Sequence, residues 1–275
     1  MYFSMDEIGF ENTEKIKNIA SESDRWQFIY DVAKSYGFGG IHVTPSLYRN
    51  EFGLDINNIP DYFQDFKLTL HFGGLHNTTT DHEAFDNALT LCFEIATRNN
   101  MHDISVHPCQ SVYGVSADEK KSIYEHFHRR IDKWLNIAMK NTFSLSLETH
   151  VSGKYFLFDG LCDYVKFIDQ YPDLGVLIDV SHNYYDGYSE DEIIKHLANK
   201  NVKGLHISDA LQKAKGASFE IGTHVAVGDG AVDFGKILKG FAHIPNLYSA
   251  LEIKASNEGV GKSLHLLREV QQRII

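Results

Sequence analysis

The chain alternates between short apolar segments and helical segments along most of its length. Seven segments rich in valine, isoleucine and leucine lie at 40–45, 66–72, 102–108, 143–150, 175–182, 202–209 and 248–254, and residues 1–5 form a weaker eighth. Short apolar runs that alternate with helical patterns at intervals of roughly 30 residues indicate parallel strands joined by right-handed crossovers. Few fold architectures are built from such a regular alternation of strands and helices.

The segments between the predicted strands carry helical periodicity and helix-end signals. One apolar face consists of Ile123, Phe127, Ile131, Trp134 and Ala138, and another of Phe85, Leu89, Cys92 and Ala96. Capping-box spacing occurs at Thr80 with Glu83, Ser116 with Glu119, and Ser189 with Glu192. Gly37 stands where a helix should end. These signals place helices between consecutive strands.

Two α/β architectures fit this order of elements, an open doubly wound sheet and a closed (β/α)8 barrel. The open sheet favours a glycine-rich phosphate loop after a strand, but neither G-x-G-x-x-G nor G-x-x-x-x-G-K-[ST] follows any predicted strand. Eight units fit a chain of 275 residues. We therefore predict an α/β fold, a (β/α)8 TIM barrel forming a single domain over residues 1–275.

The composition limits the cellular compartments and the classes of binding partner that fit this protein. A net charge of −11 disfavours the broad basic surface that grips nucleic-acid phosphates. The three cysteines have no C-x-x-C spacing, which argues against a disulfide framework or a thiolate zinc site. The N-terminus lacks the pattern of a secretory signal, and no run of about 18 apolar residues occurs. We expect a soluble cytoplasmic protein without a membrane partner, and the charge disfavours a nucleic-acid partner without removing that alternative.

Six of the predicted strands end in an ionisable residue. These residues are His71, His107, Glu148, Asp179, His206 and Glu252. In a parallel barrel the carboxyl ends of all strands meet at one face, and that face carries the active site. The sequence therefore predicts that six ionisable side chains converge on one pocket.

Converging carboxylates repel one another and lose hydration, and a divalent cation relieves both costs. Imidazole and carboxylate ligands without thiolates suit Zn²⁺, Mn²⁺, Fe²⁺ or Co²⁺. Other interpretations stay open for individual residues. His71 or His107 taken alone fits a hydrogen-bonded core histidine, and Asp179 or Asp209 fits a cap or a turn. Asp209 also fits a partner that orients His206 from outside the ligand set.

The order of these residues resembles that of the xylose-isomerase-like TIM-barrel superfamily. It runs from Glu148 through Asp-x-x-His at 179 and 182 and His-x-x-Asp at 206 and 209, then to His224 before "VGDGAVDF" and to Glu252. The superfamily includes sugar isomerases, ketose epimerases, inosose-processing enzymes and the endonuclease IV branch. The resemblance spans at least residues 66–254.

For the sugar-isomerase branch, the resemblance implies one divalent metal ion held by Glu148, Asp179, His206 and Glu252. We expect Mn²⁺ or Zn²⁺, with Co²⁺ or Fe²⁺ as alternatives. Glu148 and Glu252 would move protons on a sugar or sugar phosphate. His182 would hydrogen-bond a substrate oxygen, and His71, His107 and His224 would line the pocket. One position departs from the ketose 3-epimerases, because Gln212 stands where they usually have arginine.

Endonuclease IV provides the second interpretation, a zinc phosphodiesterase that acts on abasic DNA. His71, His107 and Glu148 would hold one zinc ion, the four ligands above a second, and His182 with His224 a third. Gly222 replaces the aspartate expected for the third ion, and the predicted loops hold few clustered basic residues besides 211–216.

Two further interpretations remain. The first is an inosose-type dehydratase, and the second is a binding module with a vestigial metal site. Relatives of this kind often form homo-oligomers, so a homo-oligomer is a further expectation.

Overall fold

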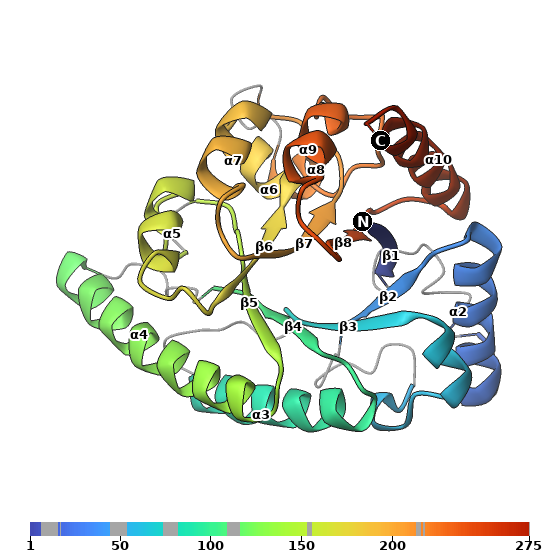
Figure 1. Ribbon diagram of the computed structural model, residues 1–275, viewed down its shortest axis with the longest axis horizontal. Coiled ribbons are helices and arrows are strands. Elements are labelled where there is room, and N and C mark those ends of the chain that lie inside the picture. Colours follow the sequence, from blue (N-terminus) through green and yellow to red (C-terminus); the bar gives the residue numbers. More distant parts are fainter. Residues whose placement is uncertain are drawn as a thin grey trace.

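Eight parallel strands close into a barrel in the computed structural model (Figure 1). The structure describes residues 1–6, 16, 18–44, 54–73, 82–108, 116–152, 156–212, 216 and 218–274. The strands are β1 (Tyr2–Asp6), β2 (Gly40–Val43), β3 (Lys67–Phe72), β4 (Asp103–Val106), β5 (Ser144–Glu148), β6 (Gly175–Asp179), β7 (Val202–Ile207) and β8 (Tyr248–Leu251). Each strand pairs with its neighbour in sequence, and β8 pairs with β1. The predicted (β/α)8 barrel is confirmed.

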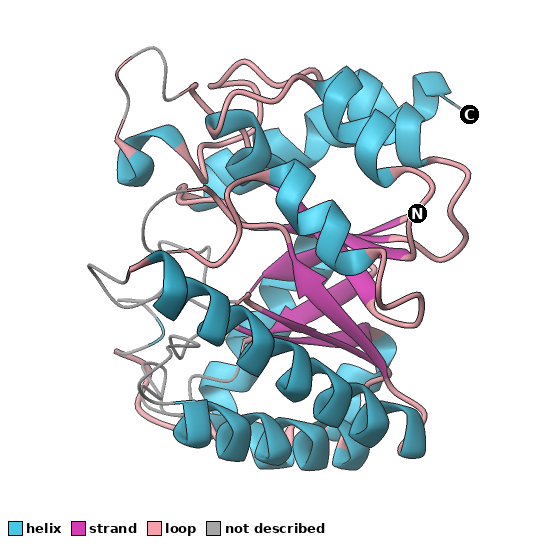
Figure 2. Ribbon diagram, turned by 90° about the vertical axis from the view of Figure 1, so that its left-hand side faces the viewer, coloured by secondary structure: helices cyan, strands magenta, loops and turns pink. Residues whose placement is uncertain are grey.

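Helices form the outer layer around the strands (Figure 2). They are α2 (Glu22–Tyr36), α3 (His82–Arg98), α4 (Ala117–Lys140), α5 (Leu161–Ile168), α6 (Val180–Tyr185), α7 (Glu190–Leu197), α8 (Phe219–Gly222), α9 (Phe234–Phe241) and α10 (Asn257–Ile274). Two short 3-10 helices, η1 (Ile56–Asn58) and η2 (Asp61–Asp65), precede β3. None of the described helices is long and apolar enough to cross a membrane.

The predicted helix signals act as expected wherever the structure describes them. Ser116 and Ser189 both form complete capping boxes, with Glu119 and Glu192 respectively. Gly37 ends α2 in the left-handed conformation, with φ of 68°. The third predicted cap, at Thr80, lies outside the described residues. Both predicted apolar faces, on α3 and α4, pack into the core between the helices and the barrel.

Side-chain alternation along the strands separates an apolar shell from a polar interior. In β3, Leu68, Leu70 and Phe72 join the core beneath the helices, whereas Thr69 and His71 are buried polar residues. Successive residues of a strand point to opposite faces, so the polar set faces the barrel axis. The same alternation recurs in β4 and β5. The barrel interior is therefore polar near the carboxyl ends of its strands.

One aromatic side chain fills the barrel interior below this polar layer. Tyr248 of β8 is 2% exposed and pairs with Gly204 of β7. A methyl group added at Gly204 would lie 2.2 Å from the Tyr248 ring, so the ring occupies the space that the missing side chain leaves. Leu177 and Ala250 pack against the same ring. The Tyr248 ring therefore packs the barrel interior below the polar layer.

Candidate metal centre

The structure brings the six strand-end residues together at the carboxyl end of the barrel. Glu148 and Asp179 are the last residues of β5 and β6, and His206 lies one residue before the end of β7. Register explains part of this convergence, because Asp179 of β6 pairs directly with His206 of β7. Two of the six follow their strands and the others lie within them, so a single ring of side chains faces the pocket.

Four of these side chains present ligand atoms to one small space. One atom each of Glu148, Asp179, His206 and Glu252 lies within 4.8 Å of the other three. Three of the four residues are buried, and 24% of the Glu252 side chain is exposed. Three oxygens and one nitrogen from such a set match the ligand preferences of divalent transition metals.

The hydrogen bonding of these atoms provides the test of whether a metal ion fits. Asp179 Oδ2 is buried and accepts no hydrogen bond from the described residues, whereas Glu148 Oε2 lies 2.9 Å from His107 Nε2 and Glu252 Oε2 lies 2.7 Å from His206 Nδ1. Three carboxylates in one largely enclosed space repel one another and lose hydration, and the imidazole contacts offset this cost only in part. A cation among them would offset the repulsion and bind the Asp179 oxygen. The residues therefore fit a divalent ion.

Glu148 is the most enclosed carboxylate of the set, with 1% of its side chain exposed. Four imidazoles surround it. The distances to its oxygens are 2.9 Å from His107 Nε2, 3.3 Å from His71 Nε2, 3.4 Å from His206 Nδ1 and 3.7 Å from His182 Nδ1. Glu148 therefore connects the carboxylate cluster to the neighbouring histidines.

Asp179 uses its two carboxylate oxygens for different purposes. Oδ1 accepts hydrogen bonds from the backbone N–H of His182 at 2.7 Å and from the Ser181 hydroxyl at 2.9 Å, so Asp179 is the N-cap of α6. Oδ2 faces the cluster without a hydrogen bond. The cap fixes the carboxylate orientation and matches the cap interpretation of Asp179, and its role as a metal ligand stays a prediction.

Electrostatics hold the two glutamates ionised. Burial raises the pKa of Glu148, but His107, His206 and His71 outweigh it and hold that pKa well below its usual range. Burial also raises the pKa of Glu252, and His206 and His224 reverse this effect and lower it. The pKa of His206 responds in the opposite sense. Burial lowers it, but Glu252 and Glu148 raise it well above the usual value. In the metal-free protein a proton on His206 therefore supplies part of the positive charge that the carboxylates need.

The outer histidines form two pairs beside the central cluster. His71 Nε2 and His107 Nε2 lie 3.2 Å apart, and with Glu148 they form a second potential ligand group. Gly73 makes room for this pair, since a methyl group there would lie 2.6 Å from the His71 ring and 2.7 Å from that of His107. Burial lowers the pKa of His71 to about 3, although Glu148 opposes the shift.

The second pair is His182 and His224, whose Nε2 atoms lie 3.3 Å apart. With Asp179 they form a third potential ligand group. His224 adopts a left-handed backbone conformation, with φ of 55°, and its Nδ1 lies 4.0 Å from Glu252 Oε1. All the histidines singled out by the sequence therefore border the central cluster.

Asp209 does not contact His206 through any hydrogen bond that the structure describes. Its carboxylate instead accepts hydrogen bonds from the backbone N–H groups of Ala210, Gly228 and Val232, each at 2.9 Å. It is 1% exposed. Of the two interpretations left open by the sequence, this geometry matches the structural one, because Asp209 anchors the loop that follows His224.

Two histidines of the site were missed by the sequence analysis. His42 of β2 is fully buried, and its Nε2 lies 3.0 Å from His206 Nε2. His150 lies beside two histidines of the site, with its ring 4.7 Å from that of His182 and 5.3 Å from that of His107. Its Nδ1 is buried without a hydrogen-bond partner among the described residues. The position of His150, two residues after Glu148 and thus on the same side of an extended chain, was a usable signal.

A cavity of about 520 Å³ adjoins the centre on the side of His224. Most of its lining comes from residues 221–229 and from the start of α10. Thr223, Lys254 and Ser256 contribute polar groups, and Lys254 also connects the two segments through a backbone hydrogen bond to the His224 carbonyl at 2.8 Å. The cavity can therefore hold a small polar molecule beside His224.

The sequence profile of the xylose isomerase-like TIM barrel family matches residues 30–270. The protein therefore belongs to the xylose isomerase-like TIM barrel family, and the resemblance noted in the sequence is confirmed. No curated protein sequence matches the chain.

Many solved structures share the fold. A D-tagatose 3-epimerase-like protein has a TM-score of 0.77 at 14% identity, covering 100% of this chain and 98% of that one. The IOLI protein with a bound zinc atom has a TM-score of 0.70 at 13% identity, and the match covers 100% of this chain and 98% of that one. The probable 3-DHS dehydratase AsbF from Bacillus anthracis has a TM-score of 0.69 at 17% identity, and the match covers 99% of both chains. At these identities the likeness establishes the fold.

Proposed function

We propose that the protein is a divalent-metal-dependent isomerase or epimerase of a sugar or sugar phosphate. Glu148, Asp179, His206 and Glu252 hold the ion, and Glu148 and Glu252 transfer protons to and from substrate carbon. Mn²⁺ and Zn²⁺ are the first candidates for the ion, because both accept mixed carboxylate and imidazole ligands. The zinc atom in the IOLI protein and the epimerase named among the similar structures support this choice.

One observation carries the proposal. Ligand atoms of three carboxylates and one imidazole lie within 4.8 Å of one another, and two of the carboxylates belong to glutamates that the surrounding histidines keep ionised. A base must be deprotonated before it can accept a proton from carbon, and both glutamates meet that condition. When bound, the ion supplies a positive charge that polarises a carbonyl oxygen of the substrate.

The two glutamates are not equivalent in access. Glu252 is the more exposed, so it is the group that meets substrate entering from the cavity beside His224 and removes a proton from carbon. Glu148 lies deeper: it takes a proton from His107, whose Nε2 lies 2.9 Å away and whose pKa Glu148 raises against the effect of burial, and passes that proton to the carbon from another side. His182 donates to a substrate oxygen, whereas His71, His107 and His224 border the pocket and exclude water. Lys254 and Ser256 contact the far end of the substrate.

Proton exchange in heavy water tests the proposal. The metal-loaded protein is incubated with ketoses, their phosphates and inososes, and deuterium incorporation at carbon is followed by NMR. We expect incorporation with the wild type and its loss by roughly 10²-fold or more in Glu148→Gln and Glu252→Gln. Glu269→Gln, an exposed change on α10, is the matched control and should retain full exchange. Undiminished exchange in both site variants would contradict the assignment.

A second candidate function follows from the three ligand groups. Glu148 belongs to the central group and to the one with His71 and His107, whereas Asp179 belongs to the central group and to the one with His182. Shared carboxylates of this kind support several ions side by side, which favours a phosphodiesterase that acts on abasic DNA.

Metal content separates the two candidates. The protein is purified without chelator and its bound ions are counted, then it is incubated with a duplex that contains one abasic site. About one ion per chain together with deuterium exchange supports the isomerase, and about three ions together with strand cleavage supports the phosphodiesterase. Deuterium incorporation coupled to loss of water would instead point to a dehydratase, the reaction named for one similar structure.

A further inference from the structure

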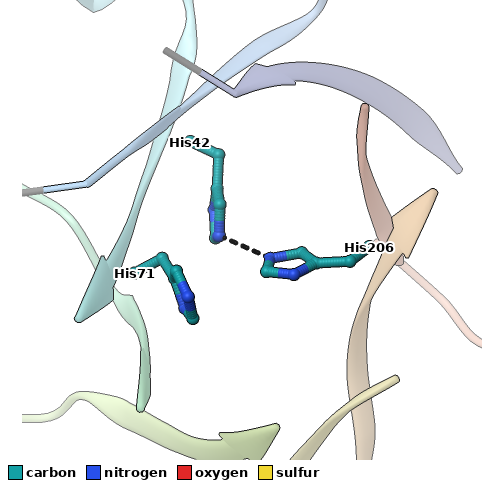
Figure 3. Close-up of side chains that lie close together, drawn as sticks. All are labelled: His42, His71 and His206. Carbon is teal, nitrogen blue, oxygen red and sulfur yellow. Dashed lines mark hydrogen bonds between the residues drawn. The ribbon is translucent and has the colours of Figure 1, made fainter. Parts of the chain in front are cut away.

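His42 is buried beneath the proposed centre and has no role in the function described above. It lies on β2, with none of its surface exposed. Figure 3 shows its ring edge directed at His206, while His71 lies to one side. The Nε2 atoms of His42 and His206 are 3.0 Å apart, and His42 Nδ1 lies 2.5 Å from the Thr69 hydroxyl on β3. Both nitrogens of His42 are therefore engaged.

The two nitrogens of His206 face different partners. Nδ1 lies 2.7 Å from Glu252 and 3.4 Å from Glu148, on the side of the carboxylates, and Nε2 faces His42. A neutral imidazole that binds a cation uses the lone pair of one nitrogen and carries its hydrogen on the other. If Nδ1 binds the ion, Nε2–H must donate to His42.

This requirement determines where the hydrogens lie on the side chains that follow, His42 and Thr69. His42 Nε2 accepts from His206, so its single hydrogen must be on Nδ1, from which it donates to the Thr69 hydroxyl oxygen. Pairing places Thr69 directly opposite His42 on the neighbouring strand, so the acceptor is held by the sheet itself. One arrangement of hydrogens therefore satisfies all three side chains.

Building on the proposed function, we propose that His42 is a positioning residue for the metal ligand His206. It accepts the Nε2 hydrogen of His206 and passes the interaction on to Thr69, which keeps the lone pair of Nδ1 directed at the ion. Without an acceptor at Nε2, the neutral His206 ring would place its hydrogen on Nδ1, where Glu252 can accept it. That tautomer cannot bind a cation through Nδ1.

The ring geometry argues against a metal ion held by His42, His71 and His206 themselves. Ligand nitrogens of all three lie within 4.8 Å of one another. However, the rings of His42 and His71 are stacked, with an interplanar angle of 20°, so the nitrogens of His71 point elsewhere. His71 Nδ1 lies 3.0 Å from the Ser105 hydroxyl, and Nε2 faces Glu148. A hydrogen-bonded chain therefore accounts for these contacts better than an ion does.

Metal affinity provides the main test, because it needs no substrate. Competition with a chromophoric chelator gives the Kd of Mn²⁺ or Zn²⁺ for the wild type and for variants. His42→Phe keeps the ring volume but removes the acceptor, and should weaken binding by about 10- to 100-fold, the usual effect of losing an outer partner of a ligand histidine. His42→Gln retains an acceptor and should recover much of the affinity. His128→Phe, which removes a histidine paired with Tyr171 on the barrel exterior, is the matched control and should bind like the wild type.

A second measurement keeps the proposal falsifiable if His42→Phe does not fold. Long-range proton–nitrogen NMR of the zinc-loaded wild type should show His206 with its hydrogen on Nε2 and His42 with its hydrogen on Nδ1. Thr69→Val changes the side-chain volume little, and it should shift the His42 signals and lower the affinity for the metal ion. His206 carrying its hydrogen on Nδ1, or a folded His42→Phe with unchanged Kd, would overturn the positioning role.

The outcomes also separate this proposal from the function on which it rests. Weaker metal binding in His42→Phe sustains the positioning role even if no sugar shows exchange, which would refute the proposed function alone. Unchanged binding together with sugar exchange refutes the positioning role alone. A wild type that binds no divalent ion refutes both.

Discussion

Replacing Asp209 should cost stability and leave the metal centre intact. Its carboxylate accepts three backbone hydrogen bonds at 2.9 Å, from Ala210, Gly228 and Val232. Asp209→Ala removes all three acceptors and leaves buried N–H groups without partners. Hydrogen bonds to a charged group contribute about 1.5–3 kcal/mol each, and partial relaxation of the loop brings the expected total loss to roughly 3–5 kcal/mol.

The conservative variant Asp209→Asn should lose less. Its amide oxygen still accepts from Ala210 and Val232, but the NH₂ group then faces the Gly228 N–H, donor against donor. We expect a loss of about 2 kcal/mol. For a protein of this size about 2–4 °C of Tm corresponds to each kcal/mol, so the predicted Tm decreases are roughly 10 °C for Ala and 5 °C for Asn.

Thermal denaturation followed by circular dichroism, with metal titrations on the same samples, measures both quantities. In Asp209→Asn the Kd for the metal should stay within about twofold of the wild type, because the loss of an outer partner of a ligand histidine would weaken it 10-fold or more. A large loss of affinity with unchanged Tm would refute the structural role and restore Asp209 as the residue that orients His206.

Three other predictions follow from the same geometry. The raised pKa of His206 places a proton on its ring, and a metal ion must displace that proton to bind. Metal affinity should therefore increase about tenfold per pH unit up to that pKa and then level off, in metal titrations at several pH values. An affinity that does not change across about pH 5–7 would contradict this. Lys254→Gln should raise KM for a phosphorylated substrate and leave that for the free sugar nearly unchanged in steady-state kinetics, and equal effects on both would argue against a phosphate contact. Gly204→Ala should lower the free energy of unfolding by about 1–3 kcal/mol, measured in urea, because the new methyl group collides with Tyr248; a neutral result would mean that the ring can move aside.

The six strand-end residues were predictable from the sequence because each of them follows an apolar run. Glu148 and Asp179 terminate such runs, and the barrel geometry brings the ends of parallel strands together whatever the loops between them do. The convergence of the ligand residues thus follows from local pattern and fold class. Their roles in catalysis stay predictions.

Partners within the site were less accessible to sequence reasoning. His42 stands inside "GIHV", in the middle of a strand, where a lone histidine has no local mark that distinguishes it from any buried polar residue. Its importance arises from contact with His206, 164 positions later in the chain. The hydrogen bonds of Asp209 likewise depend on how the loop up to Val232 folds back, which residue spacing does not determine.

The packed barrel interior under the centre affects how an ion can leave. Tyr248 packs inside the barrel below the centre, and Glu252 is the most exposed residue of that centre, so we expect an ion to exchange past Glu252. A substrate bound in the cavity beside His224 would obstruct that route. If the proposed function holds, metal loss should be slow while substrate is bound and fast in its absence, so that ions exchange mainly between catalytic cycles.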